Sequence, residues 1–128
     1  MLLGASAVQV GTGLLRSPEA GIAPAWAEAI GHTPPEGTTA TRAFSGRLGR
    51  SIRTAYVRAA ASPDAPTPAP YPIQRSLTQG MRGTGTRFND IDRIQAWAGQ
   101  SGTLARADSA QTIVRELWTD AKVLLGGA

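Results

Sequence analysis

The sequence contains no cysteine. This absence excludes disulfide bonds, thiolate zinc sites and cysteine nucleophiles. The chain also lacks an apolar run long enough to cross a membrane. Its start, Met1-Leu2-Leu3, is too short and too uncharged to be a secretory signal. We therefore expect a cytoplasmic protein that has no membrane partner.

Large apolar side chains are scarce as well. Leucine, isoleucine, valine and phenylalanine together supply 24 of the 128 residues, whereas alanine alone supplies 22. Because alanine buries little surface, this composition is close to the limit at which a compact core forms. The length would suffice for one ordinary domain. The scarcity of core material instead favours a piece of a larger domain.

Acidic residues are outnumbered, with nine Asp and Glu against 13 Lys and Arg, which gives a net charge of +4. Twelve of the basic residues are arginine, a residue that reads phosphates and base edges well. However, the arginines are spread from Arg16 to Arg115, and no aromatic stacking pattern interleaves them. We expect no nucleic-acid partner. A small, non-catalytic, Arg-rich helical binding module is the alternative from another functional class.

One stretch near the start of the chain combines a strand pattern with a glycine turn. Residues Ala7 to Val10 alternate as a short strand does, and Gly11-Thr12-Gly13 follows directly. Ser17-Pro18-Glu19 is typical of a helix start, and Leu2-Leu3-Gly4 of a helix end. In α/β proteins ligands bind where strands end, and free N–H groups in such a turn favour phosphate. The alternative interpretation is a tight connection without a ligand.

The same stretch resembles the last barrel strand of the nitronate monooxygenase family, once called 2-nitropropane dioxygenases. Two later segments are similar to the same family: Ser45-Gly46-Arg47 with its neighbouring arginines, and Trp97-Ala98-Gly99-Gln100-Ser101. The resemblance implies an FMN cofactor whose phosphate binds the backbone of Gly11, Thr12 and Gly13. It also implies that Gln9 and Gln100 line the flavin side of the barrel mouth.

The fold class that the resemblance implies is α/β. The chain would be the C-terminal fragment of a (β/α)8 TIM barrel, contributing the last strand and the C-terminal helices, and mostly helical as it stands. Residues 1–128 would form the C-terminal part of a single FMN-binding barrel domain, with a Pro-rich connector at 62–72. The family's catalytic histidine would lie upstream of Met1. His32, which is the only histidine, lies among loop-forming residues and does not match it.

The function that the resemblance implies is the oxidation of alkyl nitronates with O2 by an FMN-dependent nitronate monooxygenase. The isolated chain would be inactive because it carries no catalytic residue, and no metal ligand is expected. A flavin-dependent enoyl-acyl-carrier-protein reductase is the alternative within the superfamily, since it shares the strand end at Gln9–Thr12. The Pro-rich connector and the Trp97–Ser101 segment favour the monooxygenase.

The rest of the chain is expected to be mostly helical. In the first half of the chain, apolar spacing predicts a helix over 20–30, a loop over 31–41, a basic turn over 41–50 and a helix over 51–61. In the second half, a short helix ends at 81, a turn follows at 83–86, and a helix starts at Asn89 or Asp90 with Ile91, Ile94 and Trp97 on its apolar face. A final helix over 110–125 is capped by Asp108 or Ser109.

Overall fold

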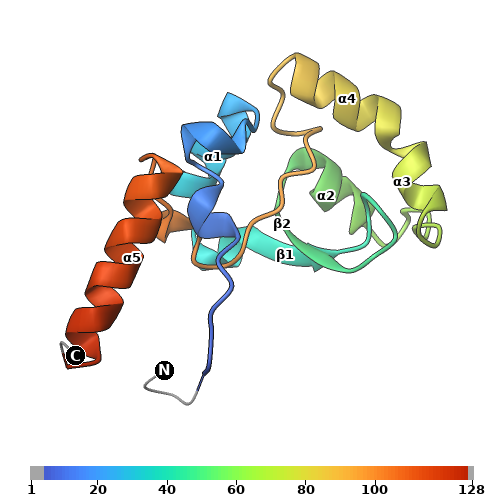
Figure 1. Cartoon of the computed structure of the whole chain (residues 1–128). Helices are drawn as coiled ribbons and strands as arrows, with labels where there is room; N and C mark the ends of the chain where they lie inside the picture. Colours follow the sequence, from blue (N-terminus) through green and yellow to red (C-terminus); the bar gives the residue numbers. More distant parts are fainter. Residues whose placement is uncertain (1–4, 127–128) are drawn as a thin grey trace.

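Helices supply most of the regular structure (Figure 1), and the computed structural model describes residues 5–126. In that range the helices are α1 (Pro24–His32), α2 (Ala55–Ala60), α3 (Ile73–Leu77), α4 (Gln79–Arg87) and α5 (Ala110–Leu124), and the strands are β1 (Thr38–Thr41) and β2 (Gly49–Ile52). Single 3-10 turns are η1 (Thr12–Leu14), η2 (Pro18–Ala20), η3 (Pro35–Gly37) and η4 (Gly102–Leu104). Within the described residues the regular structure is predominantly helical, as predicted, but two strands form at positions where none was predicted.

The strand predicted at Ala7–Val10 does not form, so this prediction is wrong for the described part of the chain. Val8 and Val10 are instead 72% and 40% exposed. A strand is stable only when a neighbouring strand satisfies its N–H and C=O groups. Here β1 and β2 pair with each other. The helix end predicted at Leu2-Leu3-Gly4 lies outside the described residues.

The helix predicted over 20–30 is present but displaced along the chain. Helix α1 begins at Pro24 and continues through Gly31 to His32. Proline suits a first helical turn because its missing N–H would have no partner there. Residues before it form the separate turn η2, which ends at Gly21 with a φ of 60°. The left-handed conformation at Gly21 therefore separates the two helical segments.

A β-hairpin replaces the loop, the basic turn and the start of the helix predicted over 31–61. Strands β1 and β2 are antiparallel, with Thr38 opposite Ile52 and Thr41 opposite Gly49. Helix α2 starts only after them, where the Val57 N–H donates to the Thr54 side chain. Ile52 and Tyr56 are four residues apart and so fit one face of a helix by spacing alone, which is why the predicted helix began too early. Ile52 belongs to a strand and is buried in the core.

Gly46, in the connection between the two strands, has a positive φ of 83°. A Cβ at this position would lie 2.6 Å from the Tyr71 nitrogen and would also overlap the Ala69 carbonyl oxygen. Glycine is thus required both for the backbone conformation and for close approach of the connector. Residues 62–72 contain no helix or strand, as predicted for this Pro-rich segment.

Two predictions in the region 83–98 are wrong. Gly83 to Thr86, expected to be a turn, lie inside helix α4. The helix expected after Asn89 does not form, because residues 91–93 form turns and residues 96–98 then pair with β2 in an extended segment (Figure 1). The Ile52 N–H donates to the Ala96 carbonyl at 3.0 Å, and the Ala98 N–H donates to the Arg50 carbonyl at 3.1 Å. Pairing with β2 satisfies these backbone groups in place of helical hydrogen bonds.

The predicted final helix is confirmed as α5, which begins after Ser109 and ends at Leu124. The Thr112 N–H donates to the Ser109 side chain at 3.1 Å, so Ser109 is the N-cap. Helix α5 extends away from the rest of the chain (Figure 1). Of its predicted apolar face, Ile113 is buried, whereas other members such as Val114 and Trp118 are exposed.

The core lies where α1, β2 and the 94–98 segment meet. Its buried residues are Ile30, Ile52, Ile94, Ala96, Ala98 and Ala105. Beside it, the fully buried ring of Phe44 contacts the rings of Tyr56 and Trp97, with centroids 5.1 and 5.6 Å away. No helix within residues 5–126 is both long and apolar enough to cross a membrane.

Candidate functional site

A cavity of about 410 Å³ lies between the N-terminal glycine turn, the 99–106 segment and one side of α5. All five residues that the sequence predicts to bind a cofactor line it: Gln9, Gly11, Thr12, Gly13 and Gln100. These residues come from segments about 90 positions apart in the sequence. The structure therefore brings together every predicted cofactor-binding residue.

A direct hydrogen bond joins the two segments that carry these residues. The Gly99 N–H donates to the Thr12 Oγ1 at 2.9 Å. Gly102 packs closely behind this contact, because a Cβ there would lie 3.2 Å from the Ile30 carbonyl oxygen. The Thr12 hydroxyl thus links the glycine turn to the 99–106 segment. Because Gln100 follows Gly99 directly, this link fixes the position of Gln100 relative to the glycine turn.

The glycine turn leaves backbone N–H groups available at the cavity. The N–H groups of Leu14 and Leu15 donate to the carbonyls of Gly11 and Thr12, so the hydrogen bonds of the turn η1 engage the carbonyl groups of these two residues and not their N–H groups. Among the described residues, the N–H groups of Gly11, Thr12 and Gly13 have no protein acceptor. Unpaired N–H groups at a cavity are suited to an anion.

Gly11 differs from the glycines that the fold itself requires. Its φ is −107°, which other residues also adopt. A Cβ added to Gly11 would meet no atom within 4 Å, so the space beside its backbone is open. At Gly13 an added Cβ would lie 3.0 Å from a Val10 methyl group. The internal packing of the described chain therefore gives no reason for glycine at position 11.

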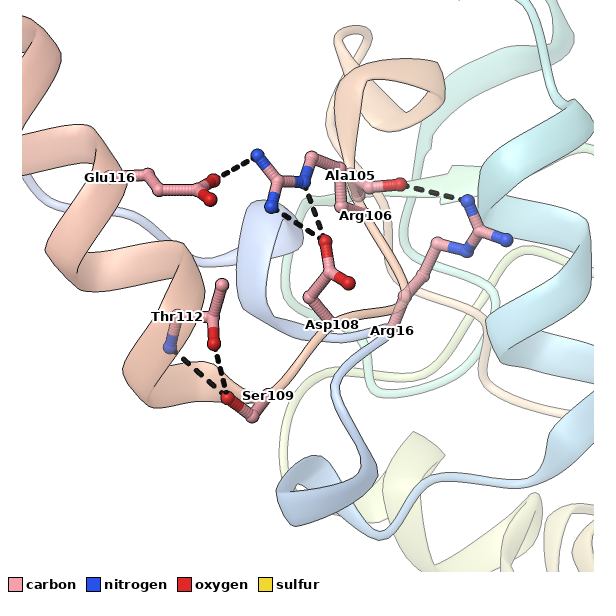
Figure 2. Close-up of polar contacts among 7 residues, drawn as sticks. All are labelled: Arg16, Ala105, Arg106, Asp108, Ser109, Thr112 and Glu116. Atoms are coloured by element: carbon pink, nitrogen blue, oxygen red, sulfur yellow. Dashed lines mark hydrogen bonds and ion pairs between the residues drawn. The ribbon is translucent and has the colours of Figure 1, made fainter.

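Charged side chains hold the opposite wall of the cavity in place, and sequence reasoning missed them (Figure 2). Arg106 bonds the Asp108 carboxylate through Nε at 2.7 Å, and it also pairs with Glu116 on α5. The hydrogen bonds to Glu116 and Asp108 raise the pKa of Arg106 above its ordinary value. Because both carboxylates occupy this guanidinium, Arg106 positions α5 rather than offering a free positive charge.

The spacing of the acidic residues on α5 is the sequence signal that predicts a polar helix face at this wall of the cavity. Glu116 and Asp120 are four residues apart and share a helix face with Ile113 and Leu117, and all four line the cavity. On the loop side, Arg16 donates to the Ala105 carbonyl at 2.8 Å (Figure 2), which anchors the segment before Arg106.

The predicted helix start at Ser17-Pro18-Glu19 does not face the cavity. Ser17 is buried and donates to the Leu14 carbonyl at 2.8 Å. The Glu19 carboxylate accepts the Ala110 N–H at 3.1 Å, so it also caps α5. Hydrogen bonds from the Glu19 and Ala110 backbone hold the pKa of Glu19 below its ordinary value.

His32 lies away from this cavity, at the exposed end of α1. Its Nδ1 is 3.0 Å from the Glu28 carbonyl oxygen, one helical turn earlier. Within residues 5–126, no group of three or more histidine, aspartate or glutamate side chains could hold a metal ion. The part of the cavity suited to an anion is therefore the backbone of the glycine turn, because the wall on α5 carries the carboxylates of Glu116 and Asp120.

Comparisons with known proteins identify the family to which the chain belongs. The family profile of nitronate monooxygenase matches residues 1–120. A probable nitronate monooxygenase of Staphylococcus aureus (strain Newman) is 33% identical over 91% of the chain. The fold superposes on a nitroalkane oxidase from Streptomyces ansochromogenes with a TM-score of 0.82 and 33% identity, over 98% of this chain and 36% of that one.

The fold is also similar to that of FabK from Thermotoga maritima, with a TM-score of 0.76 and 25% identity over 97% of this chain and 39% of that one. The chain spans about a third of the length of the curated relatives that it matches, since the S. aureus alignment covers 33% of that protein.

Proposed function

Because the chain belongs to the nitronate monooxygenase family, we propose that it forms the cofactor-binding C-terminal part of an FMN-dependent enzyme that oxidises alkyl nitronates with O2. In this proposal residues 1–128 are part of a single FMN-binding barrel domain. One observation carries the proposal: Gln9, Gly11, Thr12, Gly13 and Gln100 line one cavity.

The residues of this cavity fit the phosphate of FMN. The N–H groups of Gly11, Thr12 and Gly13 would donate to phosphate oxygens, and the open space beside Gly11 would admit them. Phosphate sites of TIM barrels lie in the loops after the last two strands, and the family resemblance supports the proposal that this turn is one of those loops. The Thr12–Gly99 hydrogen bond would fix the conformation of the Gly11-Thr12-Gly13 turn around the phosphate.

Gln9 and Gln100 would lie toward the isoalloxazine end of the cofactor, where their amide groups can donate and accept hydrogen bonds. Apolar side chains of α5, such as Ile113 and Leu117, would exclude water from the same cavity. FMN, when bound, supplies the redox chemistry, and the protein binds and orients it. We assign no proton transfer to His32, because it lies outside the cavity.

A chimaera tests this function. The segment of the Streptomyces enzyme that matches this chain is replaced by residues 1–128, and the unmodified Streptomyces enzyme serves as the control. We expect the purified chimaera to retain FMN after desalting and to consume O2 when an alkyl nitronate is added. A chimaera that folds but neither retains FMN nor responds to nitronate would contradict the proposal.

The likeness to FabK supports a second candidate, the flavin-dependent enoyl reductase suggested by the strand end at Gln9–Thr12. The same chimaera discriminates the two functions, because it is also assayed for NADH oxidation in the presence of an enoyl thioester. NADH-driven enoyl reduction without nitronate-dependent O2 uptake would favour the reductase over the monooxygenase.

A further inference from the structure

A second cavity, of about 830 Å³, forms a groove between α1, the α3–α4 segment and the extended residues 94–97. It shares no residue with the cavity around Gly11. Three arginines line it, Arg75, Arg82 and Arg87, and no acidic residue does. The volume is within the range of small-molecule sites. The groove is therefore a separate, positively charged site that the proposed FMN chemistry does not use.

The three arginines have no carboxylate partner among the described residues, where the ion pairs involve only Arg93 and Arg106. Arg82 is held in position, because its Nε donates to Thr78 Oγ1 at 3.1 Å and its Nη2 donates to the Arg75 carbonyl at 2.9 Å. Burial and the neighbouring charge of Arg75 lower the pKa of Arg82. The neighbouring charges of Arg75 and Arg82 thus have no counter-charge, which favours the binding of an anion, and Arg87, whose guanidinium lies over the Phe88 ring, adds a third positive charge to the groove.

The opposite wall of the groove is aromatic and apolar. Trp26 and Trp97 line it together with Ile22 and Ile94. The Trp26 Nε1–H donates to the Trp97 carbonyl at 3.1 Å, which fixes the Trp26 side chain against the 94–97 segment. Both tryptophans are only partly buried. A ring system that enters the groove can therefore pack against an ordered aromatic surface.

We propose that this groove binds a nucleoside diphosphate, with its phosphates among Arg75, Arg82 and Arg87 and its base against Trp26. A terminal phosphate carries about two negative charges at pH 7. A second phosphate adds one further negative charge, so the total charge of the diphosphate balances the charges of the three guanidinium groups. Arginine binds phosphate oxygens through paired N–H donors, and aromatic side chains stack on bases with little dependence on base identity.

The test measures ADP binding to the full chain carrying Trp118→Phe. This change removes the only tryptophan of the sequence that lies outside the groove, so the remaining fluorescence comes from Trp26 and Trp97. We expect ADP to quench this fluorescence saturably and to bind at least about tenfold more tightly than adenosine or pyrophosphate, because each of those supplies only one half of the contacts.

The second arm compares Arg75→Gln/Arg87→Gln with Arg115→Gln. Arg82 is left in place because it ties α3 to α4. Arg115 lies on α5, outside the groove, so Arg115→Gln controls for the loss of a positive charge elsewhere on the chain. We expect the double variant to bind ADP at least about tenfold more weakly and the control to bind it unchanged. Circular dichroism verifies that all variants keep their helices.

Three results would overturn the proposal: no saturable quenching by ADP, equal affinity for ADP and adenosine, or equal weakening in the double variant and in Arg115→Gln. The measurement repeated on the FMN-loaded chimaera separates this groove from the FMN site. ADP must bind there without displacing FMN, and displacement would show that both ligands use one site.

Discussion

Individual glycines of this chain have different physical roles. The role of Gly46 is structural, because the fold itself requires glycine at this position. Its φ of 83° lies in the region that disfavours other L-residues. In addition, the connector backbone at Ala69 and Tyr71 passes where a Cβ would lie. The Ser45-Gly46-Arg47 motif is therefore explained by packing against the Pro-rich connector. Nothing in this geometry requires a ligand.

We predict that Gly46→Ala lowers the free energy of unfolding by about 2–4 kcal/mol, since strain from the left-handed conformation adds to overlap with the connector. Gly80→Ala is the matched control, because a Cβ at Gly80 in α4 meets nothing within 4 Å. The control should be neutral or stabilising by up to about 1 kcal/mol. Urea unfolding of both variants measures the difference, and equal effects would refute this role of Gly46.

At the scale of elements, α5 is held by caps from two parts of the chain. Its own Ser109 accepts the Thr112 N–H, and the distant Glu19 accepts the Ala110 N–H. The ion pairs of Arg106 join the preceding loop to the second turn of the helix. These contacts orient the wall of the candidate cofactor cavity.

Removal of the local cap by Ser109→Ala should cost about 1 kcal/mol, because one N–H of the first turn loses its acceptor. Ser62→Ala, in the exposed connector, provides the comparison and should change stability by less than about 0.5 kcal/mol. Hydrogen exchange at the Thr112 amide reports the change locally. Unaltered protection of that amide in Ser109→Ala would mean that Ser109 does not cap the helix.

The elements that could be predicted from sequence are those whose signals are local. Helix α5 has a capping serine and an apolar stripe, and the connector has closely spaced prolines. The 94–98 segment was mistaken for a helix because Ile91, Ile94 and Trp97 happen to fit helical spacing. Its buried residues Ile94, Ala96 and Ala98 in fact alternate, which is the pattern of a strand.

Other elements could not be predicted, because distant contacts override local preference. Glycines usually disfavour helices, yet Gly85 lies in α4, where a Cβ would be 2.8 Å from the Arg93 backbone. Close packing against the following segment therefore selects glycine. At the site, the sequence predicted the cofactor-binding residues through family resemblance. It missed Arg106, Glu116 and the basic groove, because their residues are brought together only by folding.

For the whole molecule, the large apolar surface of α5 is the main feature that the described chain leaves uncovered. Val114, Leu117, Trp118, Leu124 and Leu125 are each between 45% and 71% exposed. In the proposed enzyme, where this chain supplies about a third of the length of its relatives, we expect the remaining part of the barrel to cover this helix. Burial of such surface would stabilise the whole protein.

The most direct test of the central claim is the affinity of FMN for the chimaera carrying Gly11→Val, compared with Gly80→Val. A Cβ at Gly11 meets no atom within 4 Å, so the first atom of the valine side chain does not overlap the described chain. It would instead occupy the volume proposed for the phosphate oxygens. We predict that Gly11→Val loses FMN on desalting and binds it at least about tenfold more weakly, whereas Gly80→Val retains it. Unchanged FMN affinity in Gly11→Val would contradict the proposed cofactor site.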